Sequence, residues 1–276
     1  MRFERMTREL YAKPWAIMPQ VYDAFHATFQ NLVEGRKLDA SIEIFGEKIE
    51  YKLPEEYDVI QGVAVIQIDG VLGYRISEID KACMGAVDYR DIRNAIAKAN
   101  NDESVSSILL EINSPGGMVT GLKETAEFIA NSLKPTVAFT DSLCASAGYY
   151  LASSATSIYA TESSDIGCIG TLMSWVDVSK AYEMQGVKRE LIASGKYKGM
   201  FTPGLSLTDE QRAYLQDEVD ELAEEFREYV TTRRNGVDQE NMEGQTLMGV
   251  RAKQANLIDE IGGFEAALTE AIELGA

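Results

Sequence analysis

Two short glycine-containing segments of the sequence carry residue types that could support acyl-transfer chemistry. They are residues 113–117 (NSPGG) and residues 144–148 (CASAG). Each follows an expected buried strand and precedes an expected helix, which is where open α/β sheets bind ligands. The bare amides of a Gly-Gly turn, helped by a helix dipole, can hold a phosphate or the oxyanion of a tetrahedral intermediate. The alternative for the first segment is a tight turn without chemistry.

Ser146 is the candidate nucleophile of the second segment. Its small neighbours leave room for a substrate carbonyl, although a serine at a helix start can also be a simple cap. A serine nucleophile needs a base, and His26 is the only histidine in the chain. His26 falls on an N-terminal helical pattern outside the expected α/β core, so we expect it to be structural. A lysine base is the remaining option for a serine hydrolase.

Residues 194–200 (SGKYKGM) offer two candidate lysines, Lys196 and Lys198, after an expected apolar strand at 191–193. A free lysine titrates near 10.4, but burial among apolar groups can lower its pKa to roughly 7–8, where it can act as a base. The residue types alone do not choose between the two lysines. Both could equally be solvated surface charges.

The elements expected to position these residues alternate between strand and helix. Apolar runs predict strands at 63–68, 107–112 and 136–140, and periodic patterns predict helices at 88–101, at 118–133 and from about 145. Continuous apolar strands between helices indicate an α/β fold with a parallel sheet covered by helices. A capping box at Thr208–Gln211 predicts a long helix to about 234, and a last helix is expected near 263–274.

The pattern divides the chain at about residue 57. Residues 1–57 form an N-terminal lead-in, with a helix after Pro19 and a small hairpin within 41–53. Residues 58–276 form the α/β domain with its C-terminal helical segment.

The composition limits partners and location. The formal net charge of −18 repels nucleic acid and anionic membranes, so neither is an expected partner. The three cysteines (Cys83, Cys144 and Cys168) suit neither a metal site nor a disulfide framework, so we expect no metal, no cofactor and a cytoplasmic location. No apolar run approaches the roughly 18 residues of a membrane span.

Four motifs in order resemble the signal peptide peptidase A-type serine peptidases. They are residues 113–117, 145–149 (ASAGY), 167–170 (GCIG) and 194–198, and the likeness covers roughly residues 60–265. The resemblance implies a Clp protease/crotonase-type fold of stacked β-β-α units with a small perpendicular sheet. It also implies a homo-oligomer, since such peptidases form ring-like assemblies.

The resemblance also implies roles for individual residues. Ser146 becomes the nucleophile, and Lys198 the general base, because the base of these peptidases follows a Ser-Gly-x-x pattern. Gly116 or Gly117 becomes the oxyanion hole, assisted by the amide of Ala147 or Gly148. A peptide would then be cut through an acyl-enzyme. Substrates are expected to bind as extended strands with small or apolar side chains.

Cys168 departs from the pattern of these peptidases. They usually carry a serine here that hydrogen-bonds the base lysine, so the resemblance implies a base-positioning role for Cys168. A thiol is a weaker donor and acceptor than a hydroxyl, and could therefore reduce activity.

Residues 13–19 (KPWAIMP) and 204–208 (GLSLT) are similar to segments of phage-encoded head-maturation (prohead) proteases. This likeness implies capsid or scaffold proteins as substrates, in the host cytoplasm or inside the prohead. The alternatives are a cellular cytosolic peptidase of the same type, a catalytically weak capsid-assembly protein, and a crotonase-type acyl-CoA enzyme. A crotonase-type enzyme would need an acidic base, and basic residues to bind the CoA phosphates. The net negative charge of the chain argues against it.

Overall fold

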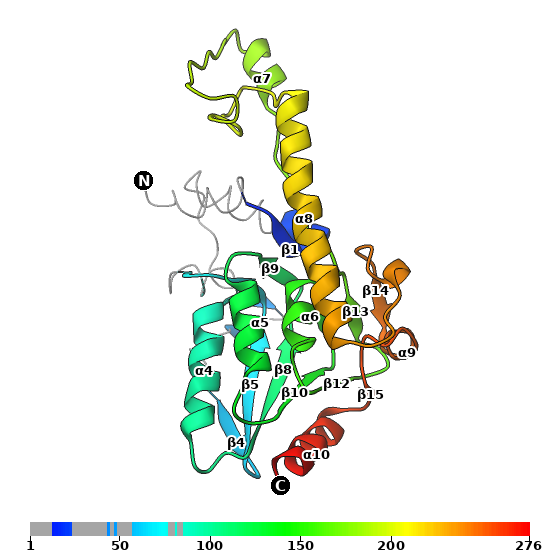
Figure 1. The fold of residues 1–276 in the computed structure, drawn as a ribbon. Coiled ribbons are helices and arrows are strands. Elements are labelled where there is room, and N and C mark those ends of the chain that lie inside the picture. Colours follow the sequence, from blue (N-terminus) through cyan, green and yellow to red (C-terminus); the bar gives the residue numbers. More distant parts are fainter. Residues whose placement is uncertain (1–12, 24–42, 45–46, 49–56, 77–80, 82–84) are drawn as a thin grey trace.

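A computed structural model describes residues 13–23, 43–44, 47–48, 57–76, 81 and 85–276 (Figure 1). His26 and Cys83 lie outside the described residues. The predicted hairpin within 41–53 is confirmed as an antiparallel pair of β2 (Glu43–Ile44) and β3 (Glu47–Lys48).

The central element is a six-stranded sheet of order β15-β12-β10-β8-β5-β4. All of its neighbouring pairs are parallel except β4–β5. This confirms the predicted parallel sheet, and each of the three predicted strands matches an element in position. The strands, in spatial order, are β15 (Glu260–Ile261), β12 (Ser157–Ala160), β10 (Thr136–Thr140), β8 (Ser107–Asn113), β5 (Val63–Asp69) and β4 (Asp58–Ile60).

The chain repeats a β-β-α unit, as the resemblance to signal peptide peptidase A-type peptidases implies. A long strand of the central sheet is followed by a short strand that leaves the sheet, and then by a helix. The second unit contains β8, β9 (Gly116–Met118) and α5 (Leu122–Ala130), and the third contains β10, β11 (Leu143–Ala145) and α6 (Ala147–Ala152). The first contains β5, β6 (Val71–Gly73), β7 (Ala86–Asp88) and α4 (Tyr89–Asn101). Figure 1 shows α4, α5 and α6 side by side on one face of the sheet.

The short strands build two smaller sheets beyond the central one. One has the order β1-β9-β6-β7, where β1 is Trp15–Ile17. The other has the order β11-β13-β14, with β13 at Asp165–Gly167 and β14 at Thr246–Met248. Part of the lead-in therefore pairs with the domain that follows it, while the predicted boundary near residue 57 stays a prediction.

Two buried clusters lie on the two faces of the central sheet. The larger includes the inner faces of α4, α5 and α6, and the smaller lies under α10 (Phe264–Gly275). Alternate residues of β5 serve the two clusters, Ala64 and Ile66 on one side and Val63 and Val65 on the other. Because both faces of β5 are buried, its sequence is apolar at successive positions and does not alternate between apolar and polar residues.

The longest helix is α8 (Asp209–Arg233), and its predicted capping box is confirmed. The Thr208 side chain accepts a hydrogen bond from the Gln211 N–H, and the Gln211 side chain accepts one from the Thr208 N–H. Residues 176–207, which include α7 (Ser179–Met184), are called the arm below. Figure 1 shows the arm around the end of α8 that points away from the central sheet.

Two predictions about local structure are wrong. The helix expected over 118–133 begins only at Leu122, because residues 116–118 continue as strand β9 and Gly121 takes a left-handed conformation before the helix. The strand expected at 191–193 is not formed. Those residues are irregular and exposed on the arm, and Ile192 is 100% accessible.

Among the helices of the described residues, none is both long enough and apolar enough to cross a membrane.

Candidate active site

Ser146 lies at a sharp turn between β11 and α6. Its φ is 53° and its ψ is −120°, a conformation that a residue with a Cβ rarely adopts. The turn is stabilised by a hydrogen bond to another strand, because the Ser146 N–H donates to the Gly167 carbonyl of β13 over 2.6 Å. Strain that is fixed by surrounding hydrogen bonds is typical of residues whose side chain must be aimed at a site.

The Ser146 hydroxyl is buried and has no hydrogen-bond partner among the described residues. It does not cap α6, so the helix-cap interpretation is wrong. A buried polar group without a partner costs free energy and needs an explanation. One explanation is that the hydroxyl is kept free to react with a substrate.

The candidate oxyanion-hole glycines lie beside this serine. A methyl group built on Gly116 would lie 2.8 Å from the Ser146 Cβ. The Gly116 N–H already donates to the Ser114 hydroxyl over 3.2 Å, and that hydroxyl donates to the Gly70 carbonyl over 2.7 Å. Gly117 lies one residue further along β9, opposite Ala16 of β1 and Leu72 of β6.

The start of α6 supplies further amides next to Ser146. The first helical hydrogen bond runs from the Tyr150 N–H to the Ser146 carbonyl over 2.9 Å, so the amides of Ala147 and Gly148 precede it. A methyl group on Gly148 would lie 3.1 Å from the Ser114 Cβ, which shows how closely the two glycine-containing segments pack. The structure thus brings Ser146, Gly116 and Ala147 close together.

Cys168 also borders the site. It directly follows Gly167, the residue that accepts the hydrogen bond from the Ser146 amide, and its own N–H donates to the Gln245 carbonyl over 2.7 Å. Burial raises the pKa of the Cys168 thiol to about 11. The thiol is therefore protonated at neutral pH, with one weak donor to offer.

Lys198 lies far from Ser146 in the structure. It is exposed on the arm, and within the described part of the chain its ammonium group makes no hydrogen bond or ion pair. The arm packs on the first turns of α8, where the Gln211 side chain donates to the Lys196 carbonyl over 2.6 Å and Tyr197 stacks on Tyr214.

Helix α6, which begins next to Ser146, packs on the last turns of α8. Tyr150 of α6 lies 4.8 Å from Phe226 and 4.2 Å from Tyr229, measured between ring centroids. From Gln211 to Phe226 the helix advances by roughly 22 Å, at about 1.5 Å per residue. The structure therefore does not bring Lys198, on the arm, to Ser146, at the start of α6, within one chain. Figure 1 shows the arm and α6 next to different ends of α8.

Lys196 is the less suitable of the two lysines. It forms an ion pair with Glu210, and that hydrogen bond raises the pKa of its amine above the usual value. A raised pKa makes a lysine a poorer base near neutral pH.

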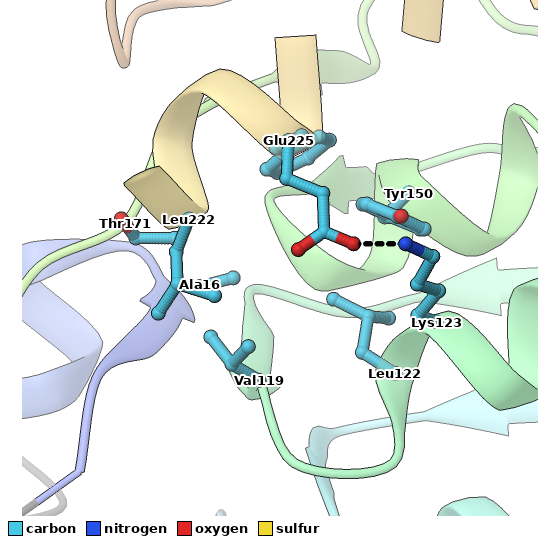
Figure 2. A pocket seen from close by; sticks show the side chains of 9 residues that line it. Ala16, Val119, Leu122, Lys123, Tyr150, Thr171, Leu222 and Glu225 are labelled. Carbon is cyan, nitrogen blue, oxygen red and sulfur yellow. Dashed lines mark hydrogen bonds and ion pairs between the residues drawn. The ribbon is translucent and has the colours of Figure 1, made fainter. Parts of the chain in front are cut away.

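The sequence reading missed strand β1 as a neighbour of the site. Trp15–Ile17 pairs antiparallel with Gly116–Met118, the strand that carries both candidate oxyanion glycines. The signal was present as a short apolar run between Pro14 and Pro19. A pocket beside this strand is lined by Ala16, Leu122, Tyr150 and Phe226, among others (Figure 2).

No group of three or more His, Cys, Asp or Glu side chains able to hold a metal ion occurs in the described ranges.

Comparison with known proteins assigns the chain to a family. The model of Peptidase family S49 matches residues 129–276. The chain belongs to peptidase family S49. The resemblance to signal peptide peptidase A-type peptidases seen in the sequence is thereby confirmed. A second family model, the NfeD1b N-terminal domain, matches residues 81–175.

Several relatives carry protease names. Capsid assembly protease C of Escherichia phage lambda is 31% identical over 235 residues, covering 83% of this chain and 53% of that protein. The putative signal peptide peptidase SppA of Enterococcus faecium is 30% identical, covering 66% of this chain and 54% of that protein. The head-tail preconnector protein GP5 of Enterobacteria phage P21 is 29% identical, covering 78% and 41%. The chain thus spans about half the length of these relatives.

A solved structure of an enoyl-CoA hydratase/isomerase family member aligns with a TM-score of 0.40 at 16% identity, covering 79% of this chain and 73% of that one.

Proposed function

We propose that this chain is a serine endopeptidase in which Ser146 attacks the peptide carbonyl and Lys198 is the general base. The observation that carries the proposal is the Ser146 hydroxyl, buried and unpartnered at a strained turn beside Gly116. Membership of peptidase family S49 supports the same reaction.

The proposed reaction is acyl transfer in two halves. The neutral amine of Lys198 takes the hydroxyl proton of Ser146 while Oγ bonds to the carbonyl carbon. An amide of the Gly116–Gly117 pair and the amide of Ala147 hold the resulting oxyanion. The lysine then returns its proton to the departing amine, which leaves an acyl-enzyme. Water, deprotonated by the same lysine, breaks the ester and restores Ser146.

We propose further that Lys198 comes from a second copy of the chain. Within one chain the arm holds it at the far end of α8 from Ser146. The arm also exposes large apolar side chains, which usually mark a surface that another protein covers. The most exposed are Val176, Met184, Val187, Leu191 and Ile192.

The buried face of α8 packs within the same chain, so it is not free to form a subunit interface. Leu215 and Phe226 are 5% and 2% accessible, and Phe226 packs on Tyr150 of the same chain. Tyr214 is 45% accessible and lies against the arm residue Tyr197. The proposed interface is therefore the arm with the first turn of α8.

In this arrangement Cys168 is a positioning residue. Its thiol is adjacent to the backbone that fixes Ser146, and its weak S–H donor or sulfur acceptor would orient the incoming lysine amine. Cys168→Ser should therefore preserve or raise activity.

The proposed substrates are capsid or scaffold proteins, and the proposed location is the host cytoplasm or the prohead. The support is the similarity to capsid assembly protease C over 83% of this chain. The net charge of −18 gives no support for a nucleic-acid partner.

The test compares the wild-type chain with Ser146→Ala and Lys198→Ala on casein and on a candidate scaffold protein, with a fluorophosphonate probe as a second readout. The proposal predicts cleavage and labelling by the wild type, and loss of both in each variant. Cleavage that survives Ser146→Ala would contradict the assignment of the nucleophile. A folded wild-type assembly that neither cleaves nor takes the probe would favour a non-catalytic assembly protein.

A further inference from the structure

Strand β1 is bound on both of its edges by the walls of the candidate active site. On one edge it pairs antiparallel with β9, with Ala16 opposite Gly117 and Ile17 opposite Gly116. On the other edge the Trp15 N–H donates to the Leu172 carbonyl over 2.8 Å, and the Leu172 N–H donates back over 2.9 Å. β1 therefore fills a slot one strand wide between β9 and Leu172.

The slot runs past the nucleophile. A methyl group built on Gly116 would meet the Ala16 carbonyl oxygen and would lie 2.9 Å from the Ile17 Cα and 2.8 Å from the Ser146 Cβ. Because these atoms surround a single point, the Ala16–Ile17 peptide group is a close neighbour of Ser146. Beyond it, the Met18 N–H donates to the Pro115 carbonyl over 3.0 Å.

The side chain of Ala16 points toward an apolar pocket (Figure 2). The pocket lies between α5, α6 and α8, and Leu122, Tyr150, Leu222 and Phe226 form its apolar wall. Lys123 and Glu225 form an ion pair across it. A cavity of about 30 Å³ is left beside the Ala16 methyl, which is room for one or two further methyl groups.

We propose that the slot between β9 and Leu172 is the substrate-binding groove of this chain, and that Trp15–Ile17 occupies it as an internal competitor. The pocket beside Ala16 then receives one substrate side chain, aliphatic and larger than alanine. This proposal rests on the proposed function of Ser146 and specifies the substrate that this site takes: an extended peptide added as a strand to β9.

The three residues of β1 belong to the main buried cluster, but three features of the strand favour a competitor that can leave. β1 has three residues and lies between Pro14 and Pro19, which lack the N–H needed to extend the ladder. Its alanine leaves the pocket partly empty. A peptide that forms the same backbone hydrogen bonds and fills the pocket would therefore displace it. Until then Ser146 is covered, in agreement with its buried hydroxyl.

Trp15 provides a probe of this displacement, because it is 1% accessible and packs edge-on against Tyr22 with ring centroids 5.8 Å apart. The experiment uses the full chain carrying Ser146→Ala and Trp175→Phe, so that no cleavage occurs and Trp15 is the only tryptophan. The ligand is the synthetic heptapeptide Lys-Pro-Phe-Val-Ile-Met-Pro with blocked ends. The matched control peptide has aspartate in place of its valine.

The valine peptide should shift the Trp15 emission to longer wavelength in a saturable way, as the ring moves into water. The aspartate peptide should bind at least tenfold more weakly, because its carboxylate would lose water against the apolar wall of Leu122, Tyr150 and Phe226. Saturable binding of the valine peptide, seen by anisotropy of a labelled copy, with an unchanged Trp15 emission would overturn the proposal. Equal binding of both peptides would overturn the assignment of the pocket.

Two variants test the same point in the active chain. Ala16→Asp should loosen β1 and raise the rate of fluorophosphonate labelling of Ser146 several-fold, whereas Ala16→Val should lower it. Ala271→Val, a change at a buried alanine of α10 on the other face of the sheet, is the control and should leave the labelling rate unchanged. Thermal unfolding of each variant is followed in parallel.

Equal labelling rates in Ala16→Val, folded Ala16→Asp and the wild type would overturn the internal-competitor role. If no variant is ever labelled but the valine peptide still moves Trp15, the peptidase chemistry fails and the groove stands. The two proposals therefore fail separately.

Discussion

At the scale of single residues, the site is built from backbone conformations that side chains rarely adopt. Ser146 and Cys168 both have a φ of 53°, and Gly116 has a φ of 105°. The sequence allowed Ser146 and the Gly-Gly pair to be chosen as candidates, because small residues surround them. It could not show that the serine hydroxyl is unpartnered, or that the Gly116 amide is already used by Ser114, because both depend on contacts between distant segments.

Gly116→Ala should lower the free energy of unfolding by at least about 1 kcal/mol, because its positive φ strains any residue with a Cβ. The added methyl would also collide with Ala16 and Ile17. Gly195→Ala is the control, since nothing lies within 4 Å of the built methyl there. Chemical denaturation measures both. Equal stabilities of the two variants would contradict the described packing.

The buried thiols predict a loss of stability at alkaline pH. Burial raises the pKa of Cys168 to about 11 and that of Cys144 to about 12, from an ordinary value of 9.0. Above pH 9 the unfolded chain loses thiol protons that the folded chain keeps. Stability therefore falls as pH rises, by up to about 1.4 kcal/mol per pH unit for each thiol.

Denaturant unfolding at intervals between pH 8 and pH 10 checks this slope. Cys168→Ala should make the slope shallower, because it removes one of the two thiols that are buried among the described residues. A slope that is unchanged in this variant would show that Cys168 is not buried as described.

At the scale of elements, α8 connects the two parts of the proposed catalytic machinery. Its last turns pack on α6, which starts at Ser146, and its first turns hold the arm that carries Lys198. The sequence predicted this helix and its capping box correctly, because periodicity over 25 residues is a strong signal. It failed at β9 and at residues 191–193, since three-residue segments carry too little periodicity to separate strand, helix and loop.

Phe226→Ala should cost about 3–5 kcal/mol of folding free energy, the usual range for a buried phenylalanine. Phe226 is 2% accessible and packs on Tyr150. Tyr214→Ala, in the same helix but 45% accessible, should cost clearly less. Thermal or denaturant unfolding of the two variants provides the comparison. A larger loss in Tyr214→Ala would mean that the arm, and not α6, anchors the helix.

At the scale of the whole molecule, the exposed apolar side chains of the arm support the proposal that two copies of the chain share a site. The apolar strands predicted the parallel sheet covered by helices, and the resemblance implied the stack of β-β-α units. The distance between Ser146 and Lys198 could not be predicted, because the resemblance gave their order along the chain and not their positions in space. Assembly is the proposed solution to that separation.

Ile192→Glu should weaken this assembly, since Ile192 is fully accessible in the single chain and a charge there would have to be buried in the interface. Sedimentation or light scattering across a concentration series should show smaller particles than the wild type forms, together with lower activity. Leu133→Glu is the control, because Leu133 is 82% accessible but lies outside the arm. A wild-type chain that is monomeric and fully active would exclude a shared site.

The most direct test of the account is a mixing experiment with two inactive chains, Ser146→Ala and Lys198→Ala. Each is purified alone, and they are then mixed in equal amounts under conditions that allow subunits to exchange. If the lysine of one chain serves the serine of another, the mixture should regain peptidase activity, to about one quarter of the wild-type level for random pairing. Confirmed exchange of subunits with no recovery of activity would contradict the shared site.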